Sequence, residues 1–164
     1  MVYEQLISRF LGRSPARFAD LGFPEPPSEM WNGYPVWISV EGHGDEANGA
    51  VIAIGVLSSG RLSITRRSVF PWNLSSLPRA EVPRIAKTLN VRGDSSLAQR
   101  LFAVDAMVKT LPLAIKRGDR IDVFANVVRV YRRAVDGSAK DAIGAARATA
   151  MAVVSTLNLP PARQ

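Results

Sequence analysis

The chain has 164 residues, of which 47% are hydrophobic and 21% charged, a composition typical of a folded globular protein. It contains no cysteine, so disulfides, zinc–thiolate sites and cysteine nucleophiles are excluded. The formal net charge is +7, but residues 1–60 carry three basic against seven acidic residues, whereas residues 61–164 carry eighteen against seven.

This charge asymmetry predicts a surface in the later part of the chain that faces a polyanion. It also permits the acidic part of one copy to meet the basic part of another, and the plainest alternative is a solvated face that only aids solubility. No apolar stretch approaches the ~20 residues that span a bilayer. Glu4, Arg9 and Arg13 interrupt the apolar residues that a secretory leader would need. We therefore expect a soluble, intracellular protein, either cytoplasmic or virion-associated.

Residues 1–32 are predicted to form an N-terminal arm and a linker. Apolar residues at helical spacing predict a short amphipathic helix over residues 3–11, and prolines at 24, 26 and 27 enforce an extended connector. The helix packs on its own core or docks on a neighbouring subunit or a membrane surface. The predicted oligomerisation residues are Tyr3, Leu6, Ile7, Phe10 and Leu11. A single domain is expected over residues 33–159, followed by a disordered tail at 160–164.

Three strands are predicted at the start of this domain. Residues 34–41 and 61–67 alternate apolar and polar positions, and residues 50–57 are continuously apolar, as in a strand buried on both faces. A polar loop is expected at residues 42–49 and a tight turn at Ser59-Gly60. These short connections predict an antiparallel meander.

The helices are predicted from their apolar periodicity. Residues 76–89 look helical, with Pro78 and Pro83 near starts or a break. Leu97, Leu101, Val104, Val108 and Leu111 form one stripe that predicts a single helix ending at Pro112. A final helix is predicted over 139–157, where small residues favour close packing. The expected fold is therefore α+β, with an antiparallel sheet of a three-stranded meander and a later hairpin, packed with three to four helices.

Residues 113–133 fit either a helix or a pair of strands. The helical alternative has one apolar face, formed by Ile121, Phe124, Val128 and Tyr131. The density of Val, Ile, Phe and Tyr favours extended backbone, so we predict strands, with residues 113–116 and 120–131 pairing across a turn at residues 116–119. The sequence Arg-Gly-Asp occurs at 92–94 and again at 117–119. Both copies are interpreted as turns and caps, not as adhesion motifs.

Catalytic chemistry has little support in the sequence. His43 is the only histidine, and with Asp45, Glu46 and Glu41 it could form a carboxylate–imidazole site, although polar hairpin loops contain such residues routinely. No phosphate-binding glycine loop is present. We therefore expect no enzyme activity, no metal, no cofactor and no small-molecule substrate.

The basic residues provide the remaining functional signal. On strands, Arg61 and Arg67 would share one face and Arg66 the other; Arg129 and Arg133 would share a face opposite Arg132. If these strands lie in one sheet, their guanidinium groups could form a phosphate-binding patch. The predicted nucleic-acid-binding residues are Arg61, Arg66, Arg67, Lys116, Arg117, Arg129, Arg132 and Arg133.

The leading hypothesis is a non-enzymatic domain that binds nucleic acid mainly through phosphates. The alternative is a self-assembling viral or phage coat or matrix protein, a homo-oligomer joined through its N-terminal arm. Its basic face would then meet nucleic acid or an anionic membrane.

Overall fold

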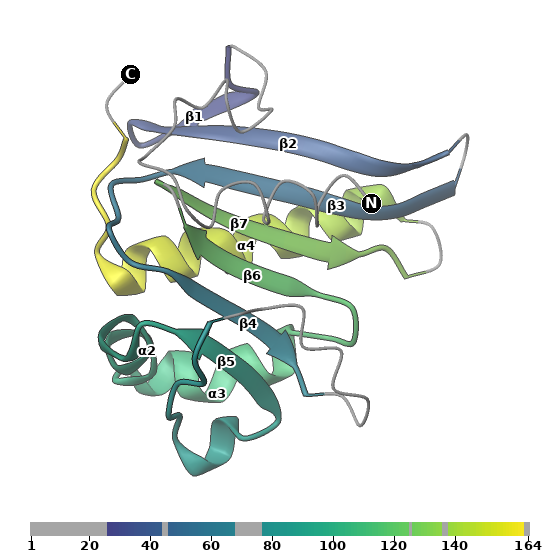
Figure 1. Ribbon diagram of the computed structural model, residues 1–164. Coiled ribbons are helices and arrows are strands. Elements are labelled where there is room, and N and C mark those ends of the chain that lie inside the picture. The colour runs from purple at the N-terminus through teal and green to yellow at the C-terminus, as the bar shows by residue number, and fades with distance from the viewer. Residues whose placement is uncertain (1–25, 44–45, 68–76, 125, 136–137, 163–164) are drawn as a thin grey trace.

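The computed structural model describes residues 26–43, 46–67, 77–124, 126–135 and 138–162 (Figure 1). These residues form an α+β fold with a seven-stranded antiparallel sheet and three α-helices. The strands are β1 (Glu29–Trp31), β2 (Tyr34–His43), β3 (Glu46–Gly55), β4 (Leu62–Arg66), β5 (Leu89–Gly93), β6 (Arg120–Phe124) and β7 (Val127–Arg133). The helices are α2 (Ser95–Phe102), α3 (Asp105–Ala114) and α4 (Ala139–Leu157), with a short 3₁₀ helix, η2, at Arg84–Ala86.

The strand order is β1-β2-β3-β7-β6-β4-β5. The β2–β3 hairpin was predicted, but β4 does not continue it, so the three-stranded meander is wrong. The β6–β7 hairpin lies between β3 and β4, and all seven residues of β7 pair with Gly49–Gly55 of β3. Alternation within one strand shows which face is buried but not which strand lies beside it, so a hairpin that comes later in the chain could take this place.

Two strands were not expected, and one predicted helix is absent. β5 begins at Leu89, the last residue of the region predicted to be helical at residues 76–89. Among the described residues of that region, only Arg84–Ala86 form a helical turn. Before that turn, Pro78 O accepts from Gly93 N and Ala80 N donates to Val91 O, so the chain runs beside β5. Pro78 and Pro83 cannot donate backbone hydrogen bonds in a helix, which favours this extended path. β1 lies inside the predicted linker and pairs with β2, the first strand of the predicted domain.

The single helix predicted from Leu97 to Leu111 is two helices, α2 and α3. Val104, a member of the predicted stripe, lies at the N-cap of α3 with extended backbone and is 42% exposed. Pro112 lies within the last turn of α3, which ends two residues later at Ala114. The loop at 42–49 is also shorter than predicted, because β2 extends to His43 and β3 begins at Glu46, with an irregular register at Glu41 and Gly42.

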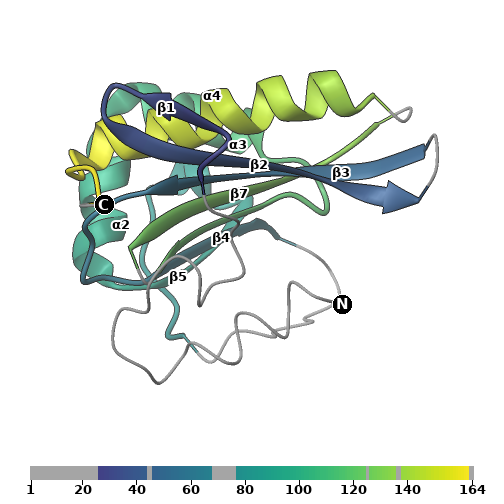
Figure 2. The ribbon, with the colours of Figure 1, turned by 90° about the horizontal axis from the view of Figure 1, so that it is seen from above.

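The final helix has the predicted bounds, and its apolar side packs on β3 and β7. Ser138 accepts a hydrogen bond from Asp141 N at its start, and Asn158 adopts a left-handed conformation (φ 50°) at its end. Ala146 and Ala150 are fully buried, and their small side chains let the helix lie close to the sheet. Figure 2 shows α2, α3 and α4 on the same face of the sheet.

The core lies between these helices and that face. Its sheet residues include Val36, Ile52, Ile54, Leu62, Ile64, Val91, Ile121, Val123, Val128 and Val130. Residues 160–162, expected in a disordered tail, are ordered beside β3: Leu57 N donates to Pro160 O at 2.8 Å and Ala162 N to Gly55 O at 3.1 Å. The predicted oligomerisation residues of the arm lie outside the described residues, so the arm stays a prediction. In the part of the chain that the structure describes, no helix is long and apolar enough to cross a membrane.

Candidate nucleic-acid interface

Residues 120–124 and 127–133 are extended, as the strand alternative predicted, but they form two strands instead of one, and the expected partner at residues 113–116 is wrong. β6 pairs with β7 from Arg120↔Tyr131 to Phe124↔Val127, whereas Leu113 and Ala114 belong to α3. The turn at residues 116–119 therefore joins a helix to a strand, and the hairpin turn lies between Phe124 and Val127. Asn126 occupies that turn with φ 64°, a left-handed conformation that asparagine tolerates.

The strand register shows that the arginines lie on different faces of the sheet. Arg66 pairs with Leu89 and Arg132 pairs with Ala50, both buried, so these two arginines lie on the helix-covered face. Arg129 and Arg133 alternate with Arg132 along β7 and lie on the opposite face of the sheet. This division follows from the two-residue period of a strand.

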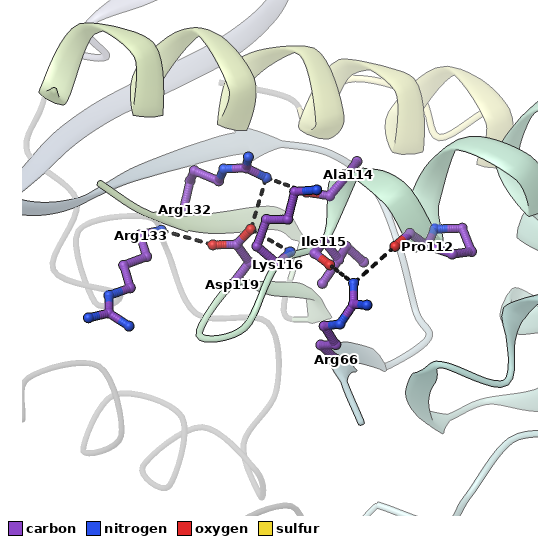
Figure 3. A network of polar contacts seen from close by, with 8 residues as sticks. All are labelled: Arg66, Pro112, Ala114, Ile115, Lys116, Asp119, Arg132 and Arg133. Atoms are coloured by element: carbon purple, nitrogen blue, oxygen red, sulfur yellow. Dashed lines mark hydrogen bonds and ion pairs between the residues drawn. The ribbon is translucent and has the colours of Figure 1, made fainter. Parts of the chain in front are cut away.

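Arg66 and Arg132 both bind the C-terminal end of α3 (Figure 3). Arg66 Nη1 donates to Pro112 O at 3.3 Å and to Ile115 O at 3.1 Å, and Arg132 Nη1 donates to Ala114 O. The last carbonyl groups of a helix have no partner within the helix and carry partial negative charge. The sequence interpretation assigned these guanidinium groups to phosphates and did not predict these contacts within the fold.

Asp119 is the centre of the same network (Figure 3). It is 5% exposed, and its carboxylate accepts from Lys116 N at 2.8 Å, from Arg133 N at 3.0 Å and from Arg132 Nη1 at 2.9 Å. The carboxylate ties the turn before β6 to the end of β7. Gly118 adopts φ 92°, which this turn requires and which other residues rarely adopt.

The other Arg-Gly-Asp copy has a similar structural role. Gly93 has φ 121°, and a Cβ there would lie 2.2 Å from Arg61 O. Asp94 Oδ2 accepts from Arg61 N at 2.9 Å, and Asp94 N donates to Arg61 O at 2.8 Å. The copy at 117–119 is a turn, as predicted, whereas Arg92 and Gly93 end β5 and Asp94 is the N-cap residue of α2, without a side-chain capping hydrogen bond. Arg61 precedes β4 and therefore lies at the opposite end of that strand from Arg67.

A row of polar residues crosses the face of the sheet opposite α4. In register across β5, β4, β6 and β7 stand Arg92, Ser63, Asp122 and Arg129. Arg129 is 6% exposed and Asp122 is 3% exposed, and Arg120 Nε contacts both carboxylate oxygens of Asp122 at 3.0 and 2.8 Å. A buried guanidinium is poorly placed for phosphates in solution, so Arg129 does not belong to an exposed patch.

Five of the exposed basic residues lie at one end of the sheet, which we call the basic end. It is formed by Arg67 after β4, Lys87 before β5, Lys116 and Arg117 before β6, and Arg133 at the end of β7. The pairs Arg66↔Leu89, Thr65↔Arg120 and Arg120↔Tyr131 bring these strand ends together, and Arg67 N donates to Thr88 O at 2.8 Å. Four of the eight predicted residues lie here.

Lys87 was missed because residues 76–89 were assigned to a helix. A signal for it was available: Leu89 and Val91 alternate with polar residues and end at Gly93, which is a strand pattern. Recognising that strand would have placed Lys87 just before its first residue.

Tyr131 lies on the face of the sheet opposite α4, beside the basic end. Its ring covers Gly49, since a Cβ there would come within 2.7 Å of the Tyr131 Cε2 and hydroxyl oxygen. Burial raises the pKa of Tyr131 above 10.0, and the negative charges of Glu41 and Asp119 raise it further, whereas Arg133 lowers it. The phenol is therefore neutral at physiological pH.

The proposed carboxylate–imidazole group is only partly in the described region. His43 pairs with Glu46 in the backbone register of the β2–β3 hairpin, Glu41 pairs with Gly49, and Asp45 lies outside the described residues. Among the residues that the structure describes, no three His, Asp or Glu side chains are grouped as a metal site would require.

Comparison with known proteins adds no assignment. The chain matches no family model, and neither a curated protein nor a solved structure is significantly similar to it.

Proposed function

We propose that this protein binds nucleic acid without catalysis, through contacts between phosphates and the basic end. The observation that supports this proposal most directly is the register of β7, β6, β4 and β5. It brings five exposed basic residues from four separate segments to one end of one sheet. Asp119, which follows Lys116 and Arg117 in the turn before β6, is buried and bound to Arg132. Glu81, which lies near Arg67 and Lys87, is exposed and offsets part of their charge.

The spacing of the strands fits a phosphate backbone. Neighbouring strands lie ~4.8 Å apart, so β7 and β5 are separated by about 14 Å across the basic end. Phosphates of one strand of duplex DNA recur every ~3.4 Å along the axis, so the basic end covers several of them. Such contacts fix position but carry little sequence information.

Binding should therefore depend steeply on salt. If all five residues contact phosphates, the logarithm of the association constant should fall against log salt with a slope of about −4.5 for duplex DNA. Fluorescence anisotropy with labelled duplex and single-stranded oligonucleotides at several salt concentrations measures this slope. Salt-independent binding, or none to either polymer, would overturn the proposal.

Charge-matched variants test which residues are responsible. The triple variant Lys116→Gln, Arg117→Gln, Arg133→Gln should make the slope less steep by about 3. The control, Arg84→Gln, Lys109→Gln, Lys140→Gln, removes the same charge from η2, α3 and α4 and should keep the slope within about 1 of the original. Equal losses in both variants would mean that total charge, and not the basic end, attracts the polymer.

Self-assembly through the N-terminal arm stays a prediction, because the apolar residues that motivate it lie outside the described residues. The mass in solution of the full chain and of a chain lacking residues 1–27 tests it directly. Normal assembly of the shortened chain would count against a role for the arm.

A further inference from the structure

A cavity lies beside β5, next to the basic end. Its volume is about 450 Å³, and it is lined by Arg67, Arg79, Ala80, Glu81, Val82, Lys87, Leu89 and Val91. It forms where the chain before η2 runs along β5 and the residues that begin β5 meet the end of β4. This volume lies within the ~300–1,000 Å³ of typical small-molecule pockets.

The lining combines two chemical characters. Leu89 and Val91 are each 2% exposed and Ala80 is 5% exposed, so part of the lining is aliphatic and held by the core. Arg67, Arg79 and Lys87 are exposed and bring three positive charges, against the single carboxylate of Glu81. A ligand that matches both the aliphatic and the basic part of this lining has an apolar part and an anionic part.

Arg67 and Lys87 belong both to this cavity and to the basic end. A phosphate backbone bound along the basic end therefore passes the cavity mouth, and a base of that strand is within reach of the aliphatic lining. A base inside a duplex cannot enter without being unstacked and unpaired, whereas an unpaired base is free to do so. Arginine planes also stack on exposed bases.

We propose that this cavity binds one unpaired nucleotide, with its phosphate at Arg67 and Lys87 and its base against the aliphatic lining beside Arg79. The inference rests on the proposed function, since it names the part of a nucleic acid that the protein distinguishes. It follows that single strands bind more tightly than blunt duplexes of equal charge. A free mononucleotide offers the same chemistry, so the experiment separates these two sources.

Calorimetric titration of the full chain at low salt, with AMP, adenosine and inorganic phosphate, tests the cavity itself. AMP should bind more tightly than either part alone. Arg79→Gln should weaken AMP binding roughly tenfold, as expected for the loss of a guanidinium plane that stacks on the base. The control Arg84→Gln removes the same charge from a neighbouring exposed position that does not line the cavity and should leave AMP binding within about twofold. Phosphate binding as tightly as AMP, or AMP binding unaffected by Arg79→Gln, would overturn the inference.

Anisotropy with oligonucleotides then distinguishes the source of the nucleotide. Arg79→Gln should weaken single-strand binding about tenfold and blunt-duplex binding only about twofold, because only the unpaired base reaches the cavity. The triple variant of Lys116, Arg117 and Arg133 should weaken both polymers and leave AMP binding within about twofold, since these residues do not line the cavity. AMP binding without polymer binding would refute the proposed function while supporting a nucleotide site. Polymer binding with no AMP binding and no single-strand preference would refute the nucleotide site alone.

Discussion

Arginine has different roles on the helix-covered face of the sheet and at its basic end. On the helix-covered face, Arg66 and Arg132 donate to carbonyl groups at the end of α3, and Arg132 also binds buried Asp119. Arg100 of α2 likewise donates to Leu157 O at the end of α4. At the basic end, Arg67, Arg117 and Arg133 are exposed. Arg66 and Arg100 are exposed as well, so the comparison teaches that arginine density in a sequence does not show which guanidinium groups are held by contacts within the fold.

The largest effect on stability is expected from Asp119→Ala. This change leaves Lys116 N, Arg133 N and the Arg132 guanidinium without their shared acceptor, and a buried ion pair that loses one partner typically costs about 3–5 kcal/mol. Urea unfolding monitored by tryptophan fluorescence measures the loss. Asp105→Ala, an exposed aspartate in the first turn of α3, is the matched control and should cost less than about 1 kcal/mol. A loss below 1 kcal/mol for Asp119→Ala would mean that this network does not hold the turn.

A smaller and more selective effect is expected from Arg66→Gln. The loss of two hydrogen bonds to the end of α3 should lower the free energy of unfolding by about 1 kcal/mol, since helix-end charges are worth roughly this much. Nucleic-acid affinity should stay within about twofold, because the guanidinium is turned to the helix and not to the basic end. Arg117→Gln should show the reverse pattern, with unchanged stability and weaker binding. If Arg66→Gln weakened binding as much as Arg117→Gln, Arg66 would contribute to nucleic-acid binding as much as Arg117 of the basic end does.

The smallest effect is expected from Tyr131 and appears only at alkaline pH. Because its pKa is raised in the folded protein, the folded state holds the phenol proton more tightly than the unfolded chain does. The resulting stabilisation is complete below pH ~10 and is lost as the pH rises through the higher pKa of the folded state. Tyr131→Phe keeps the ring over Gly49 and should reduce this alkaline loss. Ultraviolet titration of the phenols checks it, and a Tyr131 that titrates at or below 10 would contradict it.

Local pattern predicted the elements whose period is unbroken. α4 has its predicted bounds because Ser138 and Asp141 cap its start and its apolar residues recur at helical spacing. The faces of Arg66, Arg129 and Arg132 followed from strand alternation. The periodic pattern gave a wrong prediction where helical spacing continued across a break, as at Val104. It was also wrong for residues 76–89, which were predicted to be helical although they contain two prolines and lead into β5. Lys87 was missed because β5 was not predicted.

By itself, then, the sequence determined the α+β class, the strand character of β6 and β7, the Arg-Gly-Asp turn at 117–119 and the charge contrast between its parts. These depend on neighbours a few residues apart. Only the tertiary structure decided that the β6–β7 hairpin separates β3 from β4, that Arg66 and Arg132 bind α3, and that Arg67, Lys87 and Arg133 share one end. Those outcomes depend on contacts between residues up to about eighty positions apart, which no local period encodes.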